Sequence, residues 1–541
     1  LHAFRAGPNC SPSTAGCSET GGEELWGFVP YDQLEALRLR VIHEPQGRDN
    51  HVYMIARGIR FSDVFVPAPP ASPMTNVNIG GETEPSMAGV WRRILYFGRG
   101  IAGKHVTALD VTAPGPYTTT ALGTTGPIPL WSRGNPDTED PVAYAGMGQT
   151  WSIPAVAFVE SPYSTTRPWG QVNYVLAMGS GYGDTAIEGS TFYTLDALSG
   201  DVIAAVDVEA EAVARGWDRT GLAYDNALVA NAVGFNPEAF TLLTTVHPAA
   251  ASVTRFYIGD IHGRLWKILT ADPHVAIPVA DVGEDQPIGT AASLLGMPPS
   301  PDVPVPFIFV NSGNDRRVDG PFKAFGFRDD AGDAELAVGA AVTENEVEVY
   351  RPVFSLFTLT YDQGDPEASC GYTDEAFFRG TVQPATAFEC PSGTGNCSSD
   401  VLGRVFFAGT RLSDPNTVYA PPTPLACGTG TYPCRSQFDS IIYALGAKTG
   451  LAAYDLGVGG GDEAYRIFRD SRLVAIGMQA DPDPGRGGAS FTADEGLVKT
   501  VPKPPPPPGV PPQQQVSSNV MMAREPGQPP PSVHYGSTVC Q

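Results

Sequence analysis

The sequence predicts an all-β protein, and more specifically a β-propeller with long loop insertions. The 541-residue chain contains 61 Gly and 52 Pro, and 17% of its residues are charged. This composition is typical of many short strands joined by turns. A strand–turn–strand unit also recurs along the chain, which is the signature of a repeat architecture. Only residues 32–40 and 207–215, with a few neighbours, have a helical pattern.

The recurring unit is an alternating apolar strand, a polar turn that contains Gly, and a second short apolar strand. Its clearest copies are residues 192–200 followed by 201–203, and residues 442–450 followed by 451–454. Weaker copies lie at 1–4 with 22–26, 105–110, 264–268 and 322–327. The same hairpin is therefore predicted about six times along the chain.

A further apolar strand that ends in Gly precedes four of these hairpins, at residues 94–98, 174–179, 255–259 and 307–313. Three strands joined by Gly turns correspond to one propeller blade. A small sheet cannot bury both faces alone, so the blades are expected to stack around an axis, with strands from both ends of the chain closing the ring. The irregular spacing of the copies implies large insertions on the rims, where partners bind.

The propeller is predicted to span residues 1–478. From about residue 499 the chain becomes proline-rich, with proline at 504–508 and 529–531 and glutamine at 513–515. We therefore expect residues 479–541 to form a largely extended C-terminal tail. The first residues have no initiator Met and no apolar signal core, which suggests a processed product or a piece of a longer chain.

Charge and hydropathy exclude two classes of partner. Lys and Arg number 34 and Asp and Glu 58, for a formal net charge of −24, so the field of the protein repels phosphate backbones and anionic headgroups. Nucleic acid is not an expected partner. The sequence also lacks an apolar run long enough for a membrane span, which needs about 18 residues.

Six of the eight cysteines form three closely spaced pairs. The pairs are Cys10 with Cys17, Cys390 with Cys397, and Cys427 with Cys434, and each encloses six residues of turn-forming composition. Such loops can bring two sulfur atoms together, which predicts three local disulfides and an oxidising compartment. Zinc is the rival interpretation, but zinc sites favour shorter Cys spacings and clustered His. The partners of Cys370 and Cys540 stay open.

The order of these strands resembles the C-terminal propeller of the PilY family, called PilC in some bacteria. The most specific block runs from Trp91-Arg92-Arg93-Ile94-Leu95 through residues 98–104 to residues 108–112. The other similar blocks, in order over roughly residues 1–475, are 1–4, 22–30, 130–131, 179–183, 257–267, 286–288 and 405–407. The resemblance implies seven modified blades with quinoprotein-like repeats.

The resemblance also implies a function. PilY proteins are non-enzymatic proteins at the tip of type IV pili, outside the cell after export through the periplasm. They act as adhesins towards host or abiotic surfaces, and with minor pilins they promote pilus assembly and oppose retraction. The family often carries an Asp-rich calcium loop before the strand at residues 255–257. Residues 234–252 contain a single carboxylate here, so we expect that calcium site, and any other cofactor, to be missing.

Enzymatic alternatives have weaker support in the sequence. Residues 98–103 match the dinucleotide-binding pattern as text, but residues 104–111 alternate like a strand, whereas that fingerprint needs a helix. Pyrroloquinoline-quinone dehydrogenases have similar repeats, yet the Cys-Cys dipeptide that they use does not occur in the sequence. The acidic loops at 137–140 and 329–333 are interpreted as solvated turns. A generic secreted propeller scaffold is the remaining alternative.

Single His and Trp residues are interpreted as structural. His2, His105 and His262 are expected within blades. Trp26, Trp131 and Trp266 occupy equivalent places in the repeats, which predicts packing between blades. The remaining histidines that we consider, His43, His247 and His534, are expected in loops.

Overall fold

The computed structural model has two compact units. Unit 1 comprises residues 1–260 and 266–277, and unit 2 comprises residues 261–265 and 278–541. The structure describes residues 1–5, 22–42, 52–56, 58–67, 75–79, 82–86, 89–113, 118–120, 123–160, 172–217, 219, 221–222, 224–236, 253–271, 273–297, 305–313, 322–332, 340–360, 386–389, 403–412, 438–450, 465–468, 473–480, 489–495 and 518–522.

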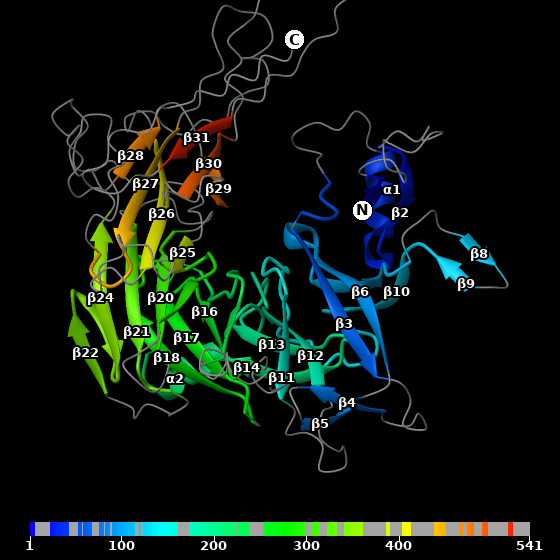
Figure 1. Cartoon of the computed structure of the whole chain (residues 1–541), viewed down its shortest axis with the longest axis horizontal. Helices are drawn as coiled ribbons and strands as arrows, with labels where there is room; N and C mark the ends of the chain where they lie inside the picture. The colour runs from blue at the N-terminus through cyan, green and yellow to red at the C-terminus, as the bar shows by residue number, and fades with distance from the viewer. Residues whose placement is uncertain are drawn as a thin grey trace, which may run out of the picture. The chain divides into compact units, whose positions relative to one another are not determined.

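The first sheet of unit 1 has four antiparallel strands in the order β10-β7-β6-β3, of which β3, β6 and β10 are labelled in Figure 1. These strands are β3 (Ile59–Pro67), β6 (Gly89–Gly98), β7 (His105–Asp110) and β10 (Ile128–Gly134). Strands β3 and β6 pair along their whole length, from Ile59 opposite Phe97 to Pro67 opposite Gly89. The connection between them carries the hairpin β4 (Thr75–Ile79) and β5 (Glu82–Ser86), and the connection from β7 to β10 carries β8 (Thr118–Thr120) and β9 (Gly123–Thr125).

The second sheet follows the chain in the simple order β11-β12-β13-β14. It consists of β11 (Ala155–Glu160), β12 (Val172–Gly179), β13 (Thr191–Asp196) and β14 (Val202–Asp207). The next sheet begins in the same way, with β15 (Val233–Phe235), β16 (Arg255–Gly259), β17 (Arg264–Leu269) and β18 (Val275–Asp281) as neighbours. In these three sheets the predicted Gly-terminated strand is the second along the chain and the predicted hairpin strand is the third. The predicted copy at residues 1–4 with 22–26 instead forms a separate two-stranded sheet.

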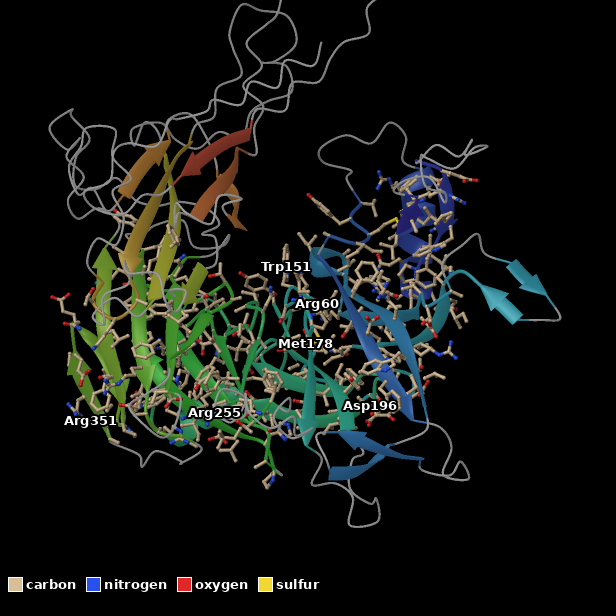
Figure 2. All side chains as sticks on the ribbon, viewed as in Figure 1. Arg60, Trp151, Met178, Asp196, Arg255 and Arg351 are labelled. Atoms are coloured by element: carbon tan, nitrogen blue, oxygen red, sulfur yellow. The ribbon has the colours of Figure 1, made fainter. Side chains whose placement is uncertain are left out.

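Two apolar clusters join the consecutive sheets of unit 1. The first packs Tyr96 and Val106 of the first sheet against Met178 and Leu195 of the second; Met178 is among the side chains marked in Figure 2. The second packs the other face of the second sheet against Phe256, Ile258 and Trp266 of the third. The edge strand β11 contacts both β3 and β15. In stacked blades, each sheet packs its faces against the sheets that precede and follow it in the chain, as these two clusters do.

The N-terminal segment covers part of the outer face of the first sheet. Strands β1 (His2–Phe4) and β2 (Glu24–Gly27) form a two-stranded sheet. Leu1, Phe28 and Ile55 pack on Leu95, Phe97 and Leu109. A 3-10 turn η1 (Tyr31–Gln33) leads into helix α1 (Leu34–Ile42).

Both predicted helices are confirmed. Residues 32–40 form η1 and α1. Helix α2 (Val208–Ala214) begins after Asp207, whose carboxylate accepts hydrogen bonds from the backbone N–H groups of Glu209 and Ala210, and Arg215 is its C-cap. An Asp at the N-cap stabilises the first helical turn, which explains why the predicted range 207–215 agrees with the observed helix.

Unit 2 contains further antiparallel sheets. Their orders are β19-β20-β21-β24, β25-β26-β27-β28 and β29-β30-β31, and β22 and β23 continue the sheet of β18. The strands are β19 (Ser293–Met297), β20 (Val305–Asn311), β21 (Lys323–Asp329), β22 (Ala341–Glu344), β23 (Val347–Tyr350), β24 (Val353–Thr360), β25 (Thr386–Glu389), β26 (Gly403–Leu412), β27 (Phe438–Gly446), β28 (Tyr465–Phe468), β29 (Leu473–Ala480), β30 (Ala489–Glu495) and β31 (Ser518–Met522).

The expectation of a mostly β protein built from antiparallel sheets is confirmed. For the hairpin that begins at residue 442, the described partners of β27 are β26 and β28, and residues 451–454 lie outside the described residues. The boundary at residue 478 stays a prediction. Strands β30 and β31 of the C-terminal sheet lie within residues 479–541.

Candidate interaction surface

Backbone geometry explains the positions of Asp and Gly in the recurring hairpin turn. At the end of β13, the Asp196 carboxylate accepts hydrogen bonds from the N–H groups of Leu198 and Ser199, at 2.8 and 2.9 Å. Gly200 closes the turn with a φ of 76°, a conformation that favours Gly. Asp110 and Asp329, at the ends of β7 and β21, accept from the residue two positions later in the same way. These aspartates are turn residues.

The pattern Gly98-Arg99-Gly100-Ile101-Ala102-Gly103 is a tight turn, as predicted. A single 3-10 turn, η3 (Gly100–Ala102), follows β6, and strand β7 begins at His105. The helix that a dinucleotide-binding fingerprint requires does not follow. The turn instead places the Arg99 side chain in the interior, where it is fully buried.

Arg99 is the centre of a buried polar network. Its Nε and Nη2 atoms donate to the two carboxylate oxygens of Asp32, at 2.9 and 2.7 Å. Nη2 also donates to Thr107 Oγ1 at 2.7 Å, and the guanidinium lies 5.3 Å from the centre of the Phe97 ring. Burial alone raises the pKa of Asp32, but the hydrogen bonds and charge of Arg99 outweigh that effect and hold this pKa below its ordinary value. This pair fixes the N-terminal segment to the first sheet.

A second polar network joins three loops of unit 1. These loops are residues 98–104, 134–151 and 180–190, and we call them the rim loops. Glu188 is the hub of this network, with a side chain 7% exposed. Its carboxylate accepts two hydrogen bonds from Lys104 Nζ, at 2.9 and 2.8 Å, and one from Asn135 Nδ2 at 2.8 Å. Asp184 pairs with the same ammonium at 2.9 Å. Burial lowers the pKa of Lys104, but these two carboxylates reverse the effect and raise it.

Backbone hydrogen bonds reinforce the same loops. The N–H groups of Gly148 and Gly189 donate to the carbonyls of Ser180 and Gly146, at 2.9 and 3.1 Å. Gly181 has a φ of 78°, and a Cβ atom there would lie 1.6 Å from the carbonyl oxygen of Gln149. The sequence therefore needs Gly at position 181 for both its conformation and this close approach.

The middle rim loop forms ion pairs with Arg133, the residue directly before it. The Arg133 guanidinium lies 3.1 Å from Asp137 and also pairs with Glu139, and it lies 5.5 Å from the centre of the Tyr144 ring. Asp137 Oδ1 accepts from the N–H groups of Glu139 and Asp140. Burial raises the pKa of Asp137, but these backbone hydrogen bonds and Arg133 outweigh it and lower the pKa. The acidic loop at 137–140 is thus internally satisfied.

The outer surface of the rim loops is apolar and acidic. Val142, Ile187 and Ile101 are 85, 67 and 44% exposed, and one belongs to each loop. The side chains of Glu139 and Asp184 are 76 and 63% exposed. The paired cations Arg99, Lys104 and Arg133, in contrast, are 0, 21 and 7% exposed.

The predicted roles of single His and Trp residues have mixed outcomes. Trp131 and Trp266 are buried in the clusters between sheets, as predicted, and Trp131 Nε1 donates to the carbonyl of Ala197. Trp26 is half-buried on β2. His2 and His105 lie on β1 and β7 as predicted, whereas His262 lies in the turn after β16. His43, His247 and His534 lie outside the described residues.

Several predictions fall on parts of the chain that the structure does not describe. All six paired cysteines, Cys370, Cys540 and residues 237–252 lie outside the described residues, so the disulfides and the lost calcium loop stay predictions. Among the described residues, three or more His, Cys, Asp or Glu side chains do not come together in a group that could hold a metal ion. A helix long and apolar enough to cross a membrane is likewise not found in that part of the chain.

Comparison with solved structures finds proteins of similar fold. The C-terminal domain of Pseudomonas aeruginosa PilY1 aligns with a TM-score of 0.43 at 16% sequence identity, over 87% of each chain. Searches of family models and of curated proteins find no match.

Proposed function

We propose that this chain is a non-enzymatic protein of the type IV pilus tip that acts through a β-propeller scaffold. The proposal includes seven modified blades over residues 1–478, an extended tail over residues 479–541, and ring closure by strands from both ends of the chain. The observation that carries it is the stacking of consecutive antiparallel sheets in chain order through shared apolar clusters. The ordered PilY-like sequence blocks supply the link to pili.

The rim loops support a binding role. Their ionisable groups are engaged with one another, as the contacts of Arg99, Glu188 and Asp137 illustrate. Such pairs fix loop geometry, and loops on a rigid scaffold are where proteins place binding residues. The proposed partners are minor pilins, with host or abiotic surfaces as adhesion targets. The proposed location is extracellular, which agrees with the three predicted disulfides.

The test is a deletion of the gene, with surface pili counted by electron microscopy. We expect few or no pili, partial recovery when the retraction motor is also deleted, and full recovery on complementation. Normal pilus numbers in the deletion strain would contradict the proposal and favour a secreted scaffold unconnected with pili. Quinone-dependent dehydrogenase activity after addition of pyrroloquinoline quinone and calcium would instead favour the enzymatic alternative.

Calcium is a separate question within this proposal. We propose that residues 234–252 bind no calcium, because they contain a single carboxylate and calcium requires six or more oxygen ligands. The melting temperature of the full chain is therefore expected to be the same with calcium and with a chelator. A calcium-dependent rise would contradict the expectation that the calcium site is missing.

A further inference from the structure

We propose that the rim loops of unit 1 form a docking surface for a protein face that carries basic side chains around an apolar centre. The inference rests on the proposed function, because it names the surface and the partner chemistry through which this scaffold would engage a minor pilin. It is carried by three properties of the loops: their fixed geometry, their exposed apolar tips and the layering of their charges.

The three loops form one body before any partner binds. Glu188 joins them, because it accepts hydrogen bonds from Lys104 in the first loop and from Asn135 in the second while it belongs to the third. Asn135 also donates to the carbonyls of Ala145 and Met147 within its own loop. A surface that is already ordered loses little conformational entropy on binding. This order distinguishes the loops from ordinary mobile connections.

Each loop presents one aliphatic side chain to solvent. Val142 is 85% exposed, Ile187 67% and Ile101 44%. Single exposed aliphatic residues are common on protein surfaces, but these three stand on loops that are hydrogen bonded to one another. Val142 and Ile187 belong to the two loops that the hydrogen bond from Gly189 to Gly146 joins. Burial of these side chains by a partner would supply the apolar part of an interface.

The charges of the loops are arranged in two layers. The rim loops and the adjoining Arg133 contain three cations, Arg99, Lys104 and Arg133, and five carboxylates. Arg99 is fully buried, and Lys104 pairs with both the buried Glu188 and the exposed Asp184. Glu139, Asp140 and Asp184 reach the solvent. The surface that a partner meets is consequently negative, although positive groups lie below it.

Charge complementarity selects the partner class. A negative surface attracts a basic protein face and speeds its association, an effect that weakens as salt rises. The same surface repels nucleic acid and anionic lipid. A bound cation is not favoured either, because Asp137 already accepts backbone hydrogen bonds and Glu188 already pairs with Lys104.

The test uses the full chain and the purified soluble domains of the minor pilins encoded with it, with binding measured by biolayer interferometry. One variant, Val142→Ser with Ile187→Ser, removes the apolar tips. A second, Glu139→Gln with Asp140→Asn, removes two negative charges. Matched controls are Val90→Ser and Asp63→Asn, exposed positions on β6 and β3 outside the rim loops. The substituted side chains are exposed, and each new amide keeps an oxygen that can accept from Arg133, from the Ala143 N–H or from Arg93. The melting temperature of each variant should therefore stay close to that of the wild type, and this is verified first.

The apolar variant is expected to weaken binding by about tenfold or more, and the controls by less than about twofold. The charge variant should slow association at low salt and reduce the dependence of the rate on salt. If the wild type binds a pilin but both rim variants bind like the controls, the inference is wrong and the proposed function stands. If the wild type binds none of the pilins, the proposed function and the inference both fail.

Discussion

Replacement of Glu188 by Gln is the most informative single perturbation of the rim loops. The substitution keeps the shape of the side chain but removes its charge. It also replaces one carboxylate oxygen by an amide NH2 group. That oxygen now accepts either from Lys104 Nζ at 2.9 Å together with Asn135, or from Lys104 Nζ at 2.8 Å together with the N–H of Asp184. Whichever oxygen is replaced, two donors then face an NH2 group that cannot accept.

The magnitude follows from burial. Breaking a buried ion pair from one side costs about 3–5 kcal/mol. Lys104 is 21% exposed and keeps Asp184 as a partner at 2.9 Å, so solvent and the second carboxylate recover part of this energy. We therefore expect Glu188→Gln to destabilise the rim loops by about 2 kcal/mol. The double variant with Lys104→Met should cost less than the sum of the two single variants, by about 1 kcal/mol or more.

Hydrogen exchange of the native full chain measures this effect locally. A cost of 2 kcal/mol corresponds to about 30-fold faster exchange of the amides of Asp184 and Gly189. The amides of β16, outside the rim loops, serve as the internal reference. Exchange rates of the loop amides within about twofold of the wild type would refute the role of Glu188 as a hub.

Three further predictions test other parts of the account. Trp266→Ala should lower the free energy of unfolding by about 3–5 kcal/mol, measured by denaturant titration, because the side chain is fully buried between sheets; a loss below about 1 kcal/mol would contradict that packing. Gly181→Ala should lower the melting temperature, since its Cβ would overlap the carbonyl of Gln149, and an unchanged melting temperature would argue against this close approach. The Asp32–Arg99 pair stabilises the fold above the ordinary Asp pKa of 3.8, and its contribution is lost as the pH falls through the lower folded pKa. In a melting series from pH 7 to strong acid, Asp32→Asn should therefore start lower and change less with pH than the wild type, and parallel curves would contradict this linkage.

Local features of the fold could be predicted from the sequence. The turn at Asp196 and Gly200 and the cap at Asp207 depend on residues only a few positions apart, so their patterns are visible in the chain. The alternation of apolar residues likewise identified β6, β12 and β16. These elements follow from backbone geometry and from the burial of both sheet faces.

The rim loops could not be predicted in the same way. Lys104 and Glu188 are separated by 84 positions, and Arg99 and Asp32 by 67. Neither pair therefore produces a local pattern in the sequence. One signal was present: Arg99 stands between two glycines directly after an apolar strand. Its partner, however, is set by the path of the N-terminal segment, which the repeat pattern does not determine.

The predicted disulfides depend on segments outside the described residues. Peptide mapping of the non-reduced protein should find Cys10 linked to Cys17, Cys390 to Cys397, and Cys427 to Cys434. Free thiols at these positions would contradict both the pairing and the oxidising compartment that it implies.

The central claim is that this chain acts at the pilus tip. Quantitative mass spectrometry of sheared pili tests it most directly, with the ratio of this protein to the major pilin measured in the wild type and in a strain without major pilin. We expect a small, constant number of copies per pilus in the wild-type fraction and none in the sheared fraction of the pilin-null strain. Equal amounts in both fractions would contradict it.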